Sequence, residues 1–436
     1  MSTSMMVDWD ALHAEALDVF QQYLQVDTSN PPGNERRACA FLGDILDAEG
    51  IPYELFDAGD DRVSLRAVLP GDGSKRPIML LNHTDVVPVE GEYWQVEPFG
   101  GVVKDGYVWG RGALDMKGIG VAQLMTFLAL KRLEVPLKRD IVFLAVADEE
   151  AGGEYGILWL ERHYPELLDV EYVLNEGGSG TTELFGVECP VFNVAVTEKG
   201  PLWLRLLAEG RPGHGSRPHD DNCLDRLVRA LYRIQQWDRP IVVSPALEEY
   251  FARLRRAGIF TGEPTSEGLA KEAAENTAIR ALLTNTISTT TARSGIKHNV
   301  IPAQAEVTLD CRLLPGVRPE DFLPQLEQVI DDPKVRVERV FEGWSEENSF
   351  DTELFRTIED VVHHHVEDAL VLPGVTVGFT DSRVFRNRDV VAYGFTGGID
   401  QPEVLATFHG HNECVSLESF RLNCEMVFDV VHRMVT

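Results

Sequence analysis

The chain has 436 residues, which is too long for one small core, and the usual scaling of domain size predicts two domains. Its 44% hydrophobic and 25% charged residues are typical of a globular protein and argue against a large disordered segment. A formal net charge of −30 repels polyanions, so we expect neither nucleic acid nor an anionic membrane as a partner.

The amino end carries acidic residues early and lacks the basic and apolar segments of a signal peptide. The longest apolar stretches, such as IVFLAVA, are far below the roughly 18 residues of a membrane span. The six cysteines show no CxxC spacing, which argues against a disulfide framework or a thiolate zinc site. We therefore expect a soluble, cytoplasmic protein.

The first half of the chain alternates helical and strand patterns. Amphipathic helices are predicted over 8–26 and 34–50, and short apolar strands over 77–85, 140–150 and 170–178. This alternation predicts an α/β domain with a mostly parallel sheet and helices on both faces.

Near residue 191 the pattern changes to that of an α+β unit. Residues 191–213 and 299–316 alternate like strands of a sheet with one solvated face, and amphipathic helices are predicted over 220–237 and 319–332. After about residue 344 the α/β character returns. We therefore expect a larger domain made of residues 1–190 and 345–436, interrupted by a smaller domain at 191–344 that carries a helical insertion at about 240–285.

Polar side chains follow three of the predicted strands. His83 and Asp85 end the first and lie two residues apart, so they point to the same side. Glu149 and Glu150 end the second and face different ways, and Glu176 follows the third. The carboxyl ends of parallel strands line a shared crevice, where unpaired carboxylates repel each other unless a cation is bound. Imidazole and carboxylate ligands suit zinc or a related divalent ion.

Other candidates have ordinary interpretations as well. Asp115 lies at the start of a predicted long helix, where it would commonly serve as the N-cap. His409 and His411 compete in FHGHNECV, and composition does not choose between them. His214 by itself is typical of a surface residue, and the consecutive histidines at 363–365 fan out over different faces of a predicted helix, as solvated residues do.

Eight segments between residues 82 and 415 carry a family resemblance. In order they are NHTDVVP, GRGALDMKG, DEEAGG, NEGG, GHGSRP, NVIPA, TDSR and HNECV. Together they resemble the co-catalytic zinc hydrolases that include aminoacylase, acetylornithine deacetylase, succinyl-diaminopimelate desuccinylase, and related dipeptidases and carboxypeptidases such as glutamate carboxypeptidase. The order, spacing and chemistry of the segments agree with that family.

The resemblance implies two divalent metal ions per chain, most simply Zn²⁺, although Co²⁺ or Mn²⁺ would suit the same ligands. His409 is preferred over His411 because the ligand histidine of the family lies three residues before an Asn-Glu pair. Asp85 would orient His83 and raise its basicity. The implied ligands are His83 and Glu176 for one ion, Glu150 and His409 for the other, and Asp115 as the bridge.

The resemblance also implies a mechanism. Glu149 would act as general base on a metal-activated water and would then pass the proton to the leaving amine. His214 of the small domain would stabilise the oxyanion, often from the partner subunit of a homodimer that forms through this domain. Asn299 and Arg383 would lie near the substrate carboxylate. For Arg383 an ion pair with Asp381 is the alternative, and Arg312 is a weaker candidate for the same role.

The expected reaction is hydrolysis of an N-acyl amino acid or a short peptide with a free carboxylate. A dipeptidase, a carboxypeptidase and the desuccinylase share the same catalytic residues, so they remain alternatives, as does an inactive metal-binding relative. A serine hydrolase is disfavoured because no GxSxG sequence appears. Closure of the small domain over the site is an expected part of turnover.

Overall fold

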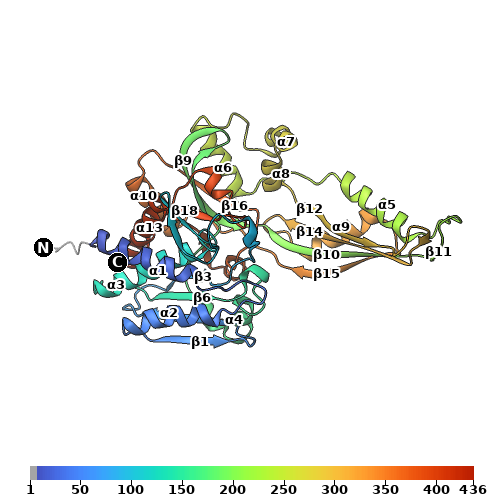
Figure 1. The fold of residues 1–436 in the computed structure, drawn as a ribbon. Helices are drawn as coiled ribbons and strands as arrows, with labels where there is room; N and C mark the ends of the chain where they lie inside the picture. The colour runs from blue at the N-terminus through green and yellow to red at the C-terminus, as the bar shows by residue number, and fades with distance from the viewer. Residues whose placement is uncertain (1–6) are drawn as a thin grey trace.

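A nine-stranded sheet forms the centre of the large lobe of the molecule (Figure 1). The computed structural model describes residues 7–436. The strands follow in the order β1 (Tyr53–Asp57), β2 (Val63–Leu69), β6 (Ile141–Val146), β3 (Ile78–His83), β7 (Tyr172–Asn175), β17 (Val391–Gly394), β9 (Val187–Glu198) and β16 (Leu370–Thr376), and β8 (Ser179–Leu184) pairs with β9.

Both faces of this sheet are covered by helices. Ile78 and Leu80 of β3 belong to the core on one face, and the alternate residues Met79 and Leu81 belong to the core on the other. The first face is covered by α1 (Trp9–Leu24), α2 (Arg36–Ala48), α3 (Lys117–Arg132), α10 (Glu353–His365) and α13 (Leu417–Val435). The second face is covered by α4 (Ile157–His163), α11 (Ser382–Arg386) and the helices α6 (Pro245–Arg256), α7 (Ser266–Glu275) and α8 (Thr277–Leu283).

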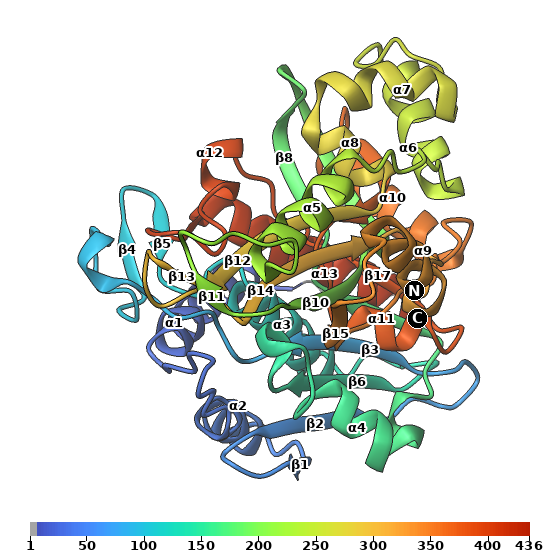
Figure 2. The same cartoon turned by 90° about the vertical axis from the view of Figure 1, so that its right-hand side faces the viewer.

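The predicted α/β fold is confirmed. Its centre, β6-β3-β7-β17, is parallel, whereas β1 and β2 on one side and the pair of β17 with β9 on the other are antiparallel. A separate three-stranded sheet consists of β4 (Val102–Lys104), β5 (Tyr107–Trp109) and β18 (Cys414–Ser416), and Figure 2 shows β4 and β5 at the left edge of the molecule. The short helix α12 (Pro402–Leu405) follows β17 in the chain. In the described residues, no helix combines the length and apolar character needed to cross a membrane.

The small lobe extends away from the large one as an antiparallel four-stranded sheet (Figure 1). Its order is β12 (Thr286–Ser294), β14 (Gln304–Leu313), β10 (Gly200–Glu209) and β15 (Val335–Glu342), and α5 (Cys223–Gln236) and α9 (Pro319–Ile330) bury one of its faces. β10 and β14 pair without a bulge from Gly200 opposite Leu313 to Glu209 opposite Gln304. At the far end, β11 (Gly213–His214) pairs with β13 (Val300–Ile301).

Two boundaries differ from the sequence-based expectation. The expected boundary at residues 190 and 191 falls inside β9, which belongs to the large sheet, and the chain enters the small lobe only after Lys199. The helices expected as an insertion within the small domain pack on the large sheet instead, since α6 buries Leu247 and Phe251 against Val191 and Leu372. The periodicity of a strand or helix does not show which of two hydrophobic cores the element packs against. The boundary at residues 190 and 191 and the placement of the inserted helices were wrong for this reason.

Lys199 holds the junction of the two lobes together. It follows β9 directly, and its buried Nζ donates to the carbonyl oxygens of Ala281 at 2.9 Å and Thr284 at 2.8 Å and to Oγ1 of Thr286 at 3.2 Å. These partners lie where the chain passes from α8 back to β12. One lysine therefore ties together two of the segments that cross between the lobes.

Candidate functional site

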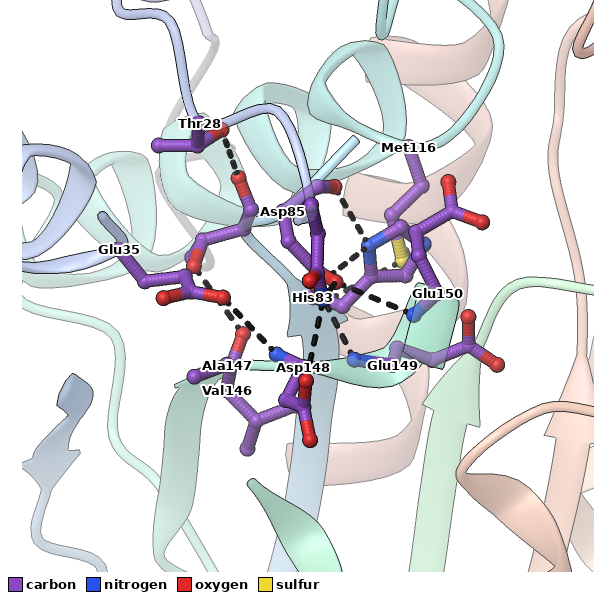
Figure 3. A network of polar contacts seen from close by, with 12 residues as sticks. Thr28, Glu35, His83, Asp85, Met116, Val146, Ala147, Asp148, Glu149 and Glu150 are labelled. Carbon is purple, nitrogen blue, oxygen red and sulfur yellow. Dashed lines mark hydrogen bonds and ion pairs between the residues drawn. The ribbon is translucent and has the colours of Figure 1, made fainter. Parts of the chain in front are cut away.

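His83 is the last residue of β3 and lies buried at the carboxyl edge of the parallel strands (Figure 3). Its Nε2 lies 2.9 Å from Asp115 Oδ1 and 3.4 Å from Glu176 Oε1. Its Nδ1 lies 2.9 Å from the backbone carbonyl oxygen of Asp85. A carbonyl oxygen can only accept, so in neutral His83 the proton lies on Nδ1 and the lone pair of Nε2 is available to a metal ion.

Asp115 joins two groups of possible metal ligands. One consists of His83, Asp115 and Glu176 and the other of Asp115, Glu150 and His409, and in each the donor atoms lie within 4.8 Å of one another. Asp115 Oδ2 lies 2.6 Å from His409 Nε2, which is 3.3 Å from Glu150 Oε2. The N-cap interpretation of Asp115 is wrong, because Met116 occupies that position of α3.

The other histidines lie elsewhere. His411 is exposed, stacks on Tyr93 and pairs with Glu90 at 3.0 Å. Of the three consecutive histidines at the end of α10, His363 and His364 are exposed and His365 pairs with Asp429 at 2.8 Å. The geometry thus brings His409, and not His411, into the cluster.

Asp85 holds the cluster differently from the sequence-based expectation. Its carboxylate lies 3.5 Å from His83 Nδ1, so the short contact to that ring is made by the backbone of Asp85. The carboxylate accepts instead from the backbone N–H groups of Glu149 and Glu150, both at 3.1 Å (Figure 3), and from Asn30 Nδ2 at 2.7 Å. Asp85 therefore fixes the turn that carries both glutamates.

Asn30 and Arg62 extend this support, and the sequence did not reveal either. Asn30 donates to both Asp85 and Asp148, and its Oδ1 accepts from Arg62 Nη2 at 2.9 Å. Asp148 has a left-handed backbone, with φ of 68°, which turns the chain from β6 into the short 3-10 helix over Glu149–Ala151. For Asn30, the signal in the sequence was the polar turn TSNPPGNE, in which the prolines restrict the backbone and the glycine allows the positive φ of 106° at Gly33.

Glu413 and Arg111 support the opposite side of the cluster. Glu413 is buried and accepts from the backbone N–H groups of Leu114 at 2.7 Å and Asp115 at 3.2 Å and from Arg111 Nη1 at 2.5 Å. Arg111 also donates to the Gly410 carbonyl at 3.0 Å, beside His409. One buried ion pair thus positions the loops of two possible ligands.

Replacing Arg111 by methionine is expected to lower the free energy of unfolding by about 3–5 kcal/mol, because Glu413 would stay buried without its cation. Urea denaturation measures the change. The matched control is Arg162→Met, which breaks the exposed pair with Glu154 and should cost at most about 1 kcal/mol. Equal effects of the two variants would contradict the role given to the buried pair.

The carboxylates of the cluster are destabilised in the absence of cations. Burial raises the pKa of Glu150 to about 7 and of Glu176 to about 8, and the Asp115 carboxylate adds to both shifts. Burial also raises the pKa of Glu149 well above its ordinary value, and Glu176 contributes. Oε1 of Glu149 and Oε1 of Glu150 are buried without a hydrogen-bond partner among residues 7–436. Crowded carboxylates with free oxygens beside two imidazoles are a donor set that fits two divalent cations.

The metal-free protein is therefore expected to lose stability as pH rises from about 5 to about 8. Glu150 and Glu176 have folded pKa values above the ordinary 4.5, so in this window the folded state binds more protons than the unfolded state. The raised pKa of His409, about 10, acts in the same direction. Thermal unfolding of chelator-treated and zinc-restored protein measures the effect, and bound cations should flatten the trend. A metal-free Tm that rises with pH in this window would contradict the expectation.

A cleft of about 790 Å³ opens beside the cluster. Glu149, which belongs to neither ligand group, lines this cleft together with Asp115, Glu150, Glu176 and His409. Most of the remaining wall is apolar or glycine, with Trp203 and Arg312 contributed by the small lobe. The cleft therefore lies between the two lobes and gives a ligand access to the cluster.

The structure does not bring His214 and Asn299 to this cleft. His214 is exposed on β11 at the far end of the small lobe (Figures 1 and 2), and Gly215 N donates to the Asn299 carbonyl there at 2.9 Å. Neither residue lines the cleft of the same chain.

Arg383 is also outside the cleft wall. It is buried, and it donates to the carbonyl oxygens of Thr380 at 2.7 Å and of Gly152 at 2.8 Å. Within residues 7–436 it forms no ion pair with Asp381, whose carboxylate oxygens are buried without a partner. Arg312, the weaker candidate, lines the cleft, with its guanidinium over Phe379 at 5.2 Å and paired with Asp310 at 2.7 Å.

Comparison with known proteins gives a consistent result. A model of peptidase family M20/M25/M40 matches residues 79–433. The chain is 30% identical over 389 residues to an N-fatty-acyl-amino acid synthase/hydrolase of Xenopus tropicalis, covering 84% of this chain and 74% of the relative. It is 29% identical over 408 residues to aminoacylase-1 of Sus scrofa, covering 91% and 90%. The fold is similar to an M20 family metallo-carboxypeptidase of Sulfolobus solfataricus, with a TM-score of 0.73, 16% identity, and 96% and 98% of the two chains covered.

Proposed function

This chain belongs to peptidase family M20/M25/M40, whose members hydrolyse amide bonds, and we propose that it cleaves N-acyl amino acids with the help of two divalent cations. The observation that carries the proposal is the pair of ligand groups that share Asp115, next to a buried Glu149 with a free carboxylate oxygen. His83 and Glu176 would hold one cation, Glu150 and His409 the other, and Asp115 both. Zinc suits this donor set.

The two cations, when bound, would lower the pKa of a water molecule and polarise the carbonyl of the substrate. Glu149 would accept the proton of that water at its free carboxylate oxygen and deliver it to the nitrogen of the leaving amine. Asp85 holds the backbone of Glu149 through a hydrogen bond, so the base stays aimed into the cleft. Arg383 would act as a positioning residue, since its bond to the Gly152 carbonyl fixes the loop that follows the glutamates.

Arg312 would bind the free carboxylate of the substrate. Its planar guanidinium suits a carboxylate, and it is the one lysine or arginine on the described wall of the cleft. Succinyl-diaminopimelate carries more carboxylates than this wall has cations, so the desuccinylase alternative is disfavoured. The similarity to aminoacylase-1 and to the N-fatty-acyl-amino acid hydrolase, which act on N-acylated amino acids, supports the same choice over a dipeptidase.

A second copy of the chain would complete the site. Leu224, Val228 and Tyr232 of α5 lie four residues apart on one face and are 42%, 58% and 62% exposed. A groove beside Val228 and Tyr232 reaches Ile287 on the edge strand β12. Such an exposed apolar face next to an edge strand favours a homodimer, and His214 would then serve the cleft of the partner subunit.

Hydrolysis of N-acetyl amino acids, dipeptides and succinyl-diaminopimelate by the purified protein tests the proposal, before and after chelation and zinc restoration. We expect release of the free amino acid from the N-acetyl substrates, its loss after chelation and its return with zinc. Chelator-resistant hydrolysis, or turnover of dipeptides alone, would contradict it.

A further inference from the structure

A β-bulge in the small lobe determines the direction of Phe341. The pairing of β15 with β10 shifts by one residue at Val340, so Phe341 lies opposite Trp203. In the register that β15 follows up to that point, Phe341 would lie opposite Leu202, which is buried under α5 and α9. The bulge therefore turns Phe341 to the other face of the small sheet, the face on which Trp203 lines the cleft.

Phe341 contacts the large lobe at Gly152. A methyl group at Gly152 would lie 2.6 Å from Cε2 and 2.7 Å from Cζ of the Phe341 ring, so the ring leaves room there for a hydrogen atom only. Gly152 is buried and has a φ of 108°, which is a second reason for glycine at this position. A side chain of the small lobe thus packs directly on the backbone of the large lobe.

Gly152 directly follows the turn that carries Glu149 and Glu150 (Figure 3). Its N–H donates to the Glu149 carbonyl oxygen at 2.8 Å, and its own carbonyl oxygen accepts from Arg383 Nη2 at 2.8 Å. The Phe341 ring adds a third contact, which comes from the other lobe. The end of the turn is therefore held from both lobes.

Other aromatic rings hold Phe341 in place. Its ring centroid lies 5.0 Å from that of Trp203 and 5.7 Å from that of Phe379, which belongs to the large lobe. The guanidinium groups of Arg312, from the small lobe, and Arg383, from the large lobe, lie over Phe379 at 5.2 and 5.1 Å from its centroid. Phe341 is thus packed against aromatic neighbours from both lobes.

We propose that Phe341 is a positioning residue for Glu149. Its ring holds Gly152 and so keeps the turn in the conformation that aims Glu149 into the cleft. Because Phe341 belongs to the small lobe, the base is fully held only while the two lobes keep this relative placement. Phe341 is not part of the described cleft wall, so it acts through the turn and not on the substrate. The role of Glu149 as the base rests on the proposed function, whereas the contact with Gly152 does not.

Hydrogen exchange tests the contact without any turnover. The backbone N–H groups of residues 149–153 all donate hydrogen bonds, so their exchange reports local opening of the turn. In zinc-loaded Phe341→Ala this exchange should be at least about tenfold faster than in the unaltered protein, while exchange in β6 stays the same. The matched control is Val340→Ala, which shortens a side chain that is 60% exposed on the same strand and should leave the exchange of the turn unchanged.

Kinetics test the role in catalysis. With N-acetyl amino acids, Phe341→Ala should lower kcat at least about tenfold and change KM less than about threefold, because the turn is displaced while the contacts to the substrate remain. Arg312→Met, which removes the proposed partner of the substrate carboxylate, should instead raise KM. Phe341→Leu keeps an apolar side chain and should show a smaller loss of kcat than Phe341→Ala.

A cycle of two variants isolates the contact. Gly152→Ala should lower kcat at least about tenfold, because its methyl group would overlap the Phe341 ring and displace the turn. In the double variant with Phe341→Ala the methyl group has room, so kcat should be no lower than in the less active single variant. The strain of alanine at this φ is present with and without the ring and cancels from the comparison. Losses that multiply in the double variant would show that the two residues act independently, which would contradict the inference.

Failure of the inference can be distinguished from failure of the proposed function. If N-acetyl amino acids are hydrolysed but Phe341→Ala matches its control in both exchange and kcat, the function stands and the inference is wrong. If the unaltered enzyme hydrolyses nothing, the proposed function fails, and the exchange experiment alone decides whether Phe341 holds the turn. Circular dichroism and zinc content establish that each variant is folded and loaded.

Discussion

Replacing Glu149 by glutamine is expected to lower kcat by about 10³- to 10⁴-fold, at the upper end of what a general base contributes. Glutamine has nearly the same shape but cannot accept the proton of the attacking water. The metal content should stay near two ions per chain, because Glu149 belongs to neither ligand group. Elemental analysis together with steady-state kinetics on N-acetyl amino acids measures both quantities.

Glu154→Gln is the matched control for this variant. Glu154 follows Glu149 in the same loop region, but its side chain is 54% exposed and pairs with Arg162, so its loss should leave kcat unchanged. If Glu149→Gln remains active, another group takes the proton. If the metals leave with the Glu149 carboxylate, this residue is a ligand and the division of roles among the glutamates is wrong.

A heterodimer of Glu149→Ala and His214→Ala subunits is expected to regain about half of the wild-type activity, although each homodimer is inactive or nearly so. His214 lies at the far end of the small lobe, away from the cleft of its own chain. In the heterodimer, the subunit that keeps Glu149 receives His214 from the other subunit, and one of the two sites is complete. Heterodimers purified through two different tags allow the measurement.

If His214 served its own chain, the heterodimer would contain no complete site and would stay inactive. That result would contradict the proposal of a shared site. Val228→Glu provides an independent control, because a charge in the exposed face of α5 should yield monomers by light scattering. Those monomers should bind both metals and turn over as slowly as His214→Ala. Full activity in a monomer would show that the second copy is unnecessary.

Much of the cluster could be predicted because it lies at strand ends. His83 and Glu176 end or follow neighbouring parallel strands, and Glu149 and Glu150 follow the strand on the other side of β3, so the sheet itself brings them together. Asp115 and His409 lie in loops, and no periodicity places a loop. For these two residues the expectation came from the family resemblance.

The supporting residues could not be predicted, because their partners are remote in sequence. Arg111 and Glu413 are 302 positions apart, and Asn30 and Asp85 are 55 positions apart. A single sequence contains no signal that such pairs meet. The structure places Arg312, and not Arg383, on the wall of the cleft. The sequence could not show this, because each arginine lies two residues after an aspartate and only the fold distinguishes them.

Because β10 and β14 pair without interruption, we expect the small lobe to rotate as a rigid body about its junction with the large lobe. Ten residues of β10 at about 3.3 Å each span about 33 Å from the junction at Lys199 towards His214, so a rotation of about 10° at the junction would displace the far end by about 6 Å. A displacement that is small at Lys199 is thus amplified at His214, where it exceeds the length of a hydrogen bond. The packing around Lys199, far from His214 itself, would therefore determine how precisely the His214 imidazole is positioned.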